Sequence, residues 1–238
     1  DWTVMQKESS TEFTGYETLE SDSSVLAVIK RDESVQKVSE GDDVEIILDK
    51  TPFYAERGGQ MGDTGTIHFE NGNIEVSDTI SPYGSIYVHR GKITKGSLSI
   101  GADVKTIVDF SRRENLRRNH TATHLVHAAL REIIGPHVRQ SGSLVHSDYL
   151  RFDFTSLEGL SEDLIKDVEN RVNLSIRKNI DVQVHYTTYN KAIEEGALAF
   201  FDEKYDHEVR TIKIDAPWSY ELCGGTHMDS TGGIGLFK

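Results

Sequence analysis

The sequence is poor in the residues and runs that mark secreted or membrane proteins. One cysteine in 238 residues excludes an internal disulfide and is typical of a reducing compartment. No apolar run approaches the roughly 20 residues that a bilayer-spanning helix needs. The first ten residues have neither the basic nor the apolar stretch of a signal peptide. We therefore expect a globular, cytoplasmic protein that makes no contact with a membrane.

Positive charge is also scarce, because 26 lysines and arginines stand against 39 aspartates and glutamates, for a formal net charge of −13. This balance argues against tight, sequence-independent binding of long nucleic acids. The exception is the segment 111–140, which holds six arginines and two glutamates. A phosphate backbone responds to the local field, so these arginines are candidates for a nucleic-acid contact. A solvated, arginine-rich helix face is the alternative.

Residues 1–110 predict a β-rich domain. Short runs of β-branched residues alternate with turn signals, and no helical pattern lies between them. The turn signals are 71–73, 82–84, Gly91 and Gly101. Strands of this length and spacing are typical of a small barrel or sandwich. The expected strands are 25–29, 44–48, 65–69, 74–76, 86–88 and 104–108.

Residues 111–238 predict a second domain, of α+β class with an antiparallel sheet. A stretch without glycine or proline over 112–134 indicates a long helix that stops at Gly135 and Pro136. Apolar residues at helical spacing indicate a second helix: Leu160, Leu164, Ile165, Val168, Val172 and Ile176. The other expected elements are strands at 144–145, 150–154, 182–186 and 209–214, a short helix at 190–195, and a loop-like tail from Trp218.

Two pairs of residues suggest a metal site. His120 and His124 are four apart on the long helix, so their imidazoles share one face and can reach a single ion. Cys223 and His227 are also four apart, and the two glycines between them can adopt the positive φ of a tight turn. Either pair alone is a weak signal, but together they supply three imidazoles and the only thiol of the chain. Zinc suits this set of ligands best.

The residues leave open what such a zinc would do. Four protein ligands normally define a closed structural site, whereas a catalytic zinc keeps one position open. A labile ligand, a five-coordinate ion, or an ion that only positions the substrate would each reconcile four ligands with catalysis. The helix lacks the glutamate of an H-E-x-x-H motif, so a metalloprotease is not indicated.

The two pairs lie within the motifs NHTATHL at 119–125 and LCGGTH at 222–227. Together these resemble the paired motifs of alanyl-tRNA synthetase editing domains and of their freestanding relatives. Five further segments extend the resemblance over nearly the whole chain: FTGY at 13–16, PFYAERGGQMGD at 52–63, QSGSL at 140–144, LRFDF at 150–154 and EKY at 203–205. The class II aminoacylation core is not found in this sequence. We expect an excised part of a synthetase, with a freestanding editor as the alternative.

The resemblance implies a translation-factor-like β-barrel over 1–110 and a zinc-binding editing core over 111–238. It also implies hydrolysis of Ser-tRNA(Ala) and Gly-tRNA(Ala). By position, the zinc ligands would be His120, His124, Cys223 and His227, and Gln140 would belong to the amino-acid pocket. The implied partners are the acceptor end of tRNA(Ala) and the aminoacylation and C-terminal parts of the full-length synthetase, to which ATP binding would belong.

Such an enzyme has a demanding specificity problem. It has to cut serine esters and spare alanine esters, which differ by one hydroxyl, and serine is the larger, so exclusion by size cannot work. A polar group that requires the hydroxyl can discriminate strongly, because alanine leaves that group unpaired. Gln140 and Thr123 are the candidates, although Thr123 is equally suited to helix packing. Glycine has no hydroxyl, so acceptance of its esters needs a different basis.

A glycine-rich segment and the basic helix supply the remaining candidate residues. Backbone N–H groups of Gly58 and Gly59, together with Gln60, are candidates for contact with the terminal adenosine or the ester. A hairpin turn without chemistry is the alternative there. The candidate contacts to the acceptor stem are four arginines of the long helix: Arg112, Arg113, Arg117 and Arg118.

Two other functions fit parts of the pattern. A structural-zinc, tRNA-binding module without hydrolytic activity agrees with the set of four protein ligands. A zinc amidohydrolase that acts on a small molecule is disfavoured by the basic helix and by the lack of an obvious acidic residue bridging the metal.

Overall fold

The computed structural model describes residues 10–156, 159–199 and 207–238, so the EKY segment at 203–205 lies outside the described residues. Contacts within the chain define two compact units. The first unit contains Asp1–Arg57 and Met61–Arg113, and the second contains Gly58–Gln60 and Glu114–Lys238. Among the described residues, no helix is long and apolar enough to cross a membrane.

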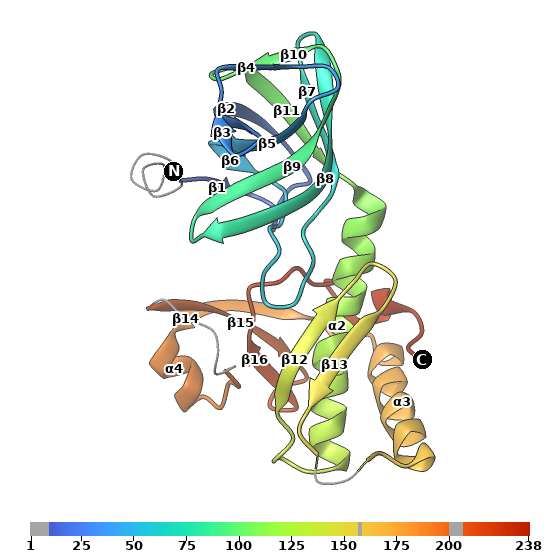
Figure 1. Ribbon diagram of the computed structural model, residues 1–238. Coiled ribbons are helices and arrows are strands. Elements are labelled where there is room, and N and C mark those ends of the chain that lie inside the picture. The colour runs from blue at the N-terminus through green and yellow to red at the C-terminus, as the bar shows by residue number, and fades with distance from the viewer. Residues whose placement is uncertain (1–9, 157–158, 200–206) are drawn as a thin grey trace. The chain divides into compact units, whose positions relative to one another are not determined.

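Six strands of the first unit form a closed antiparallel barrel (Figure 1). Their order is β11-β7-β8-β9-β5-β2, and pairing of β11 with β2 closes the sheet. The strands are β2 (Glu20–Lys30), β5 (Asp43–Leu48), β7 (Gly65–Phe69), β8 (Gly72–Tyr83), β9 (Ile86–Lys95) and β11 (Asp103–Val108). Every strand expected in this half is present, which confirms the predicted barrel.

Short strands and a core of branched side chains complete the first unit. β1 (Glu12–Phe13) runs parallel to β6 (Lys50–Thr51), β3 (Glu33–Ser34) extends the sheet beside β2, and β10 (Ser97–Ser99) pairs with β4 (Lys37–Ser39). Because side chains alternate along a strand, one face of each strand fills the barrel. Its fully buried residues include Val28, Ile46, Ile67, Ile74 and Ile93.

The predicted turn at Gly91 is wrong. Gly91 lies inside β9, where it pairs with Val44 on one side and Val76 on the other. A Cβ at this position would lie 2.3 Å from the carbonyl oxygen of Glu75, so only glycine permits this approach of two backbones. The register of β8 shifts just after Val76, as expected where an extra residue is accommodated in a ladder. The glycine marks crowding between strands, and β8 and β9 are therefore longer than the sequence predicts.

The second unit combines helices with two antiparallel sheets (Figure 1). It contains most of the long helix α2 (Phe110–Ile133), together with α3 (Glu162–Arg177), α4 (Tyr189–Glu194) and the 3-10 helix η1 (Thr231–Ile234). A hairpin pairs β12 (Gln140–Val145) with β13 (Leu150–Phe154). The other sheet has the order β14 (Gln183–Thr188), β15 (Glu208–Ile214), β16 (Ser219–Leu222). The predicted α+β class, with its antiparallel sheet, is confirmed.

One core holds this unit together. Leu125 and Ala129 of α2 pack with Val172 of α3 and with Ile212 and Ile214 of β15, all of them buried. This apolar stripe occupies one side of α2, so the opposite side, which carries the histidines, is left to face other segments.

Two details of the second half were predicted wrongly. The tail from Trp218 is not all loop, since Ser219–Leu222 forms the buried strand β16. Its sequence, SYEL, is shorter than a typical strand and has no apolar run, so pattern alone does not identify it. Ile165, which the helical spacing places on the apolar face of α3, is 51% exposed.

A buried histidine makes the barrel sensitive to acid. His89 on β9 is fully buried; its Nδ1 donates to the carbonyl oxygen of Ile46 at 2.9 Å, and its Nε2 accepts from the Thr51 hydroxyl at 2.7 Å. Burial lowers the pKa of His89 to about 4, because the charged imidazole would lose its hydration. The unfolded chain, with a histidine pKa of about 6.5, therefore binds more protons than the barrel between these values.

We predict that stability of the barrel is fully present above about pH 6.5 and is lost progressively toward pH 4. The shift corresponds to about 3 kcal/mol. His89→Gln should unfold with a weaker pH dependence over this range, as measured by urea unfolding followed through the amide resonances of β5 and β9. The exposed His68→Gln is the matched control and should keep the parent slope. Equal slopes for the parent and His89→Gln would contradict the prediction.

Candidate metal centre

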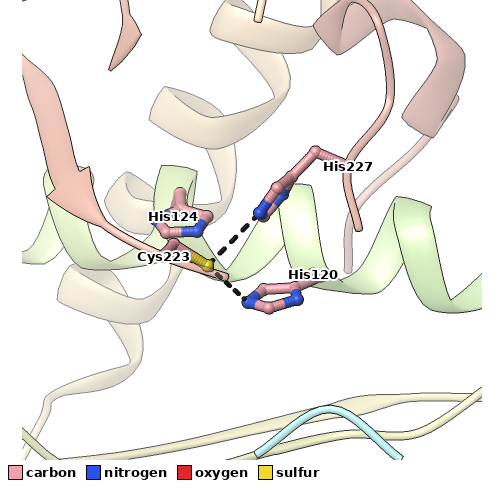
Figure 2. Close-up of side chains that lie close together, drawn as sticks. All are labelled: His120, His124, Cys223 and His227. Carbon is pink, nitrogen blue, oxygen red and sulfur yellow. Dashed lines mark hydrogen bonds between the residues drawn. The ribbon is translucent and has the colours of Figure 1, made fainter. Parts of the chain in front are cut away.

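Four side chains of the second unit converge on one point (Figure 2). His120 and His124 project from α2, and Cys223 and His227 come from the segment that follows β16. The Cys223 Sγ lies 3.4 Å from His120 Nε2 and 3.3 Å from His227 Nε2, and all four ligand atoms lie within 4.8 Å of one another. Tetrahedral zinc with ordinary bond lengths holds its nitrogen and sulfur ligands about 3.3–3.6 Å apart. The structure thus brings the two predicted pairs to the spacing of a metal site.

Each imidazole is oriented through its other ring nitrogen. His120 Nδ1 lies 2.7 Å from Gln60 Oε1, and His124 Nδ1 lies 2.5 Å from Glu221 Oε2. His227 Nδ1 has a longer contact, 3.4 Å, with the Thr121 hydroxyl. Because an acceptor stands at each Nδ1, all three histidines carry their proton there and direct the lone pair of Nε2 inward. This arrangement of outer partners is typical of histidines that bind a metal.

The protonation states also suit metal ligands. Burial raises the pKa of the Cys223 thiol, but His120 and His227 outweigh it and hold that pKa well below its ordinary value. Burial lowers the pKa of His227 to about 3, so its imidazole is neutral. A thiolate and neutral imidazoles are the forms that bind zinc.

His124 supplies the sharpest test of fit. Its Nε2 is buried and makes no hydrogen bond among the described residues. Burial lowers the pKa of His124, yet the neighbouring Glu221 and Cys223 outweigh burial and raise the pKa to about 10. The surroundings therefore favour a positive charge at this nitrogen, and a metal ion supplies one. Three imidazoles and a thiolate form a donor set that suits zinc.

Glu221 is the functional residue that sequence reasoning missed. It lies on β16, is 3% exposed, and receives His124 Nδ1 on one carboxylate oxygen and His127 Nδ1 on the other, each at 2.5 Å. Burial raises the pKa of Glu221, but the two histidines outweigh burial and lower it to about 2, so the carboxylate is ionised. Three histidines on one helix face and a glutamate two positions before Cys223 are the signal from which it could have been found.

The segment 223–227 does not form the turn that its sequence predicts. Gly224 and Gly225 are not among the described glycines with positive φ, so the expected reason for them is wrong. Gly225 is required by space instead, because a Cβ there would lie 2.0 Å from the His120 ring. Arg210 holds the segment by donating from one nitrogen to the carbonyl oxygens of Cys223 at 2.8 Å and Gly225 at 2.9 Å.

The arginines of α2 bind groups of the chain itself. Arg113 is 2% exposed, pairs with Asp63, and donates to the carbonyl oxygens of Gly15 and Pro52. It is thus a buried structural residue and is not available to a phosphate, which corrects its expected role.

The other three arginines are partly exposed and also have partners within the chain. Arg112 donates to the carbonyl oxygen of Gly62 at 3.3 Å, and Arg118 donates to that of Gly233 at 3.1 Å. Arg117 donates from Nε to the carbonyl oxygen of His227 at 2.6 Å, so it holds the segment 223–227 against α2. The basic segment is therefore not simply a solvated face.

The other predicted site residues, Thr123, Gln140 and Gly59, contact residues outside the four-residue cluster. Thr123 donates its hydroxyl proton to the carbonyl oxygen of Asn119 at 2.8 Å, as a threonine packed within a helix does. Gln140 begins β12 and donates to the Ser143 hydroxyl at 3.2 Å. Gly59 lies against the same residue, since a Cβ there would be 2.4 Å from Ser143 Oγ. Gln140 and the glycine-rich segment therefore meet at Ser143.

Comparison with known families identifies the class of protein. Residues 2–112 match a family model described as tRNA synthetases class II (A). Residues 209–238, which include Cys223 and His227, match the threonyl and alanyl tRNA synthetase second additional domain. Both matches are therefore to parts of aminoacyl-tRNA synthetases, and the second is a domain that the threonyl and alanyl enzymes share.

The individual relatives are all named as enzymes for one amino acid, alanine. The chain is 50% identical over 228 residues to an alanine–tRNA ligase of Thermoanaerobacter sp. (strain X514). These residues make up 96% of this chain and 26% of that protein. It is 49% identical over 234 residues to the alanine–tRNA ligase of Thermotoga petrophila (98% and 27%) and 45% identical over 235 residues to that of Pseudomonas fluorescens (99% and 27%). The chain belongs to the alanyl-tRNA synthetase family and spans about a quarter of the length of these relatives.

We predict that Glu221→Gln weakens metal binding by roughly 10- to 100-fold. An amide has one accepting oxygen, so its NH₂ group would face an imidazole N–H and leave a buried donor unpaired. The dissociation constant is measured by competition with a chelator of known affinity. Glu208→Gln, an exposed change on β15, should leave it unaltered. A Glu221→Gln chain that binds metal as tightly as the parent would show that the carboxylate does not support the site.

Proposed function

We propose that this chain hydrolyses the aminoacyl ester of Ser-tRNA(Ala) and Gly-tRNA(Ala), with one zinc ion held by His120, His124, Cys223 and His227. The observation that carries the proposal is the convergence of three imidazoles and one thiol, whose ligand atoms all lie within 4.8 Å of one another. The relatives are named alanine–tRNA ligases, and the motifs at 119–125 and 222–227 resemble those of the editing domains of that family.

The residues around the centre have separate roles in the proposed reaction. A bound zinc would supply a Lewis acid toward the ester carbonyl. Glu221 orients His124 and Thr121 orients His227. Arg117 and Arg210 hold the segment that carries Cys223 and His227. An aminoacyl ester is already activated, so positioning the ester and polarising it account for most of the catalysis required.

Gln140 is the proposed reader of the serine hydroxyl. Its partner, Ser143, is a hydroxyl that a substrate hydroxyl can replace without leaving the amide unpaired. Thr123 is the weaker candidate, because its only proton is already donated to Asn119. Gly59 lies beside Ser143, and the backbone N–H groups of Gly58 and Gly59 are the proposed contacts for the terminal adenosine. The reader and the adenosine contact would then both lie near Ser143.

The proposed partners are the acceptor end of tRNA(Ala) and the remainder of the synthetase. Arg112, Arg117 and Arg118 are partly exposed and are proposed to contact the phosphate backbone, whereas Arg113 is dropped from that set. The hydrogen bonds of Arg117 and Arg118 within the chain use only some of the five N–H groups that each guanidinium offers, so a phosphate can share these two side chains.

A second function is favoured by one observation. All four ligands come from the chain, and each histidine is held by a further residue, as in a structural zinc site. The chain would then bind tRNA and leave its ester intact. Hydrolysis, measured alongside zinc content, separates this function from the first.

We predict one equivalent of zinc per chain and zinc-dependent release of serine from Ser-tRNA(Ala), with little release of alanine from Ala-tRNA(Ala). Chelation should remove zinc and hydrolysis together, and added zinc should restore both. His124→Ala and Cys223→Ala should lose zinc by elemental analysis, while His137→Ala, at an exposed position, should retain it. Unchanged zinc in both ligand variants would contradict the site, and a zinc-loaded chain that leaves Ser-tRNA(Ala) intact would favour the structural module.

We predict that Gln140→Ala lowers kcat/KM for Ser-tRNA(Ala). The loss of transition-state stabilisation should be about 1–3 kcal/mol, the usual cost of an unpaired polar group. Glycine has no hydroxyl to lose, so Gly-tRNA(Ala) hydrolysis should fall less. The measurement is the ratio of the two kcat/KM values, with zinc content as the control. Equal losses on both substrates would make Gln140 a positioning residue for the ester, and a loss only in Thr123→Val would move the reader to Thr123.

A further inference from the structure

Gln60 is a fully buried polar side chain of the glycine-rich segment, and all of its bonds go to the metal centre. It belongs with Gly58 and Gly59 to the second unit, and its exposed fraction is 0%. Its Oε1 accepts from His120 Nδ1 at 2.7 Å and from the Thr226 backbone N–H at 3.0 Å. Its Nε2 donates to the Thr226 hydroxyl at 2.8 Å.

The contacts define the orientation of the amide and therefore the tautomer of His120. A backbone N–H can only donate, so the atom that faces Thr226 N is the carbonyl oxygen of Gln60. The same oxygen faces His120 Nδ1, which must then carry the proton. The lone pair of His120 therefore lies on Nε2, the atom 3.4 Å from Cys223 Sγ.

Gly225 closes the other side of this contact. A Cβ at Gly225 would lie 2.0 Å from His120 Cε1 and 3.0 Å from Gln60 Oε1, so the ring has no room to rotate away from its acceptor. Thr226, which Gln60 binds twice, stands directly before His227 in the chain. One side chain thus contacts a ligand of α2 and the backbone that leads to a ligand of the tail.

We propose that Gln60 is a positioning residue of the metal centre, which fixes the tautomer and ring orientation of His120 and holds Thr226 so that His227 reaches the ion. Gln60 thereby acts for His120 as Glu221 acts for His124, and it does not contact the ester. This assignment rests on the proposed metal site and gives the glutamine of the Gly-Gly-Gln segment a role on the protein side of that site.

Two substitutions in the whole chain separate this role from simple packing. Gln60→Met keeps the volume of the side chain but removes the acceptor, and it should weaken metal binding by roughly 10- to 100-fold. Gln60→Glu keeps an acceptor for both His120 and the Thr226 N–H, and the Thr226 hydroxyl can donate to it. It should bind metal within a few-fold of the parent. Dissociation constants are measured with zinc by chelator competition, which needs no activity.

The His120 imidazole provides a second readout. In the zinc-loaded parent, long-range proton–nitrogen correlation spectra should show a slowly exchanging proton on Nδ1. Gln60→Glu should move that proton downfield, since an anionic acceptor makes a stronger hydrogen bond, and Gln60→Met should make its exchange fast. Gln183→Met, an exposed change on β14, is the matched control and should alter neither the spectrum nor the affinity.

Each outcome decides the assignment. Parent-like zinc affinity in Gln60→Met, or equal losses in Gln60→Met and Gln60→Glu, would overturn it. If Gln60→Met does not fold, an unchanged Nδ1 proton in Gln60→Glu overturns it alone. A parent chain that binds no zinc would overturn the metal centre together with this inference. Binding by the parent without serine release would contradict only the proposed hydrolysis and leave the role of Gln60 in place.

Discussion

A carboxylate buried between two imidazoles determines how the second unit is assembled. An ionised Glu221 at 3% exposure would be strongly destabilising without hydrogen bonds, and His124 and His127 supply them at 2.5 Å each. This requirement fixes β16 against the histidine face of α2. Residues two apart on an extended segment share a side, so Cys223 follows Glu221 toward the same helix. Glu221 binds His124 and His127 at Nδ1, whereas the Cys223 thiol approaches His120 and His227 at Nε2.

Hydrogen bonds from guanidinium groups satisfy carbonyl groups of the segment 223–227, as backbone N–H groups do in helices and strands. The segment 223–227 has no helix or strand of its own, and buried carbonyl groups without partners would be destabilising. Arg210 binds the carbonyl oxygens of Cys223 and Gly225, and Arg117 binds that of His227. The charge count of 111–140 suggested a nucleic-acid contact or a solvated face. The structure shows that part of this positive charge holds the ligand segment in place.

Local patterns predict most of the elements, and the spacing of two pairs of residues predicts the cluster. The barrel strands, α2 and α3 follow from β-branched runs and helical periodicity, and the spacing of His120, His124, Cys223 and His227 identified the cluster. β16 was missed because four residues carry too little pattern, and Gly225 was explained wrongly because its need for space arises from His120, over a hundred positions away. Glu221 and Gln60 act only through such distant contacts. No single local pattern points to Gln60, and Glu221 becomes recognisable only when its place before Cys223 is combined with the histidine face of α2.

The hydrogen bonds that orient the three imidazoles differ in strength. This difference suggests how a zinc ion with four protein ligands could also take part in the proposed hydrolysis. His120 and His124 sit on a rigid helix and have Nδ1 acceptors at 2.7 and 2.5 Å. His227 lies on an irregular segment, and its Nδ1 contact with Thr121 is 3.4 Å, the weakest of the set. Thr121 also receives the Met228 N–H and donates to Arg117, so its hydroxyl is shared three ways. If one protein ligand yields its place to a substrate, the contacts make His227 the one that moves at least cost.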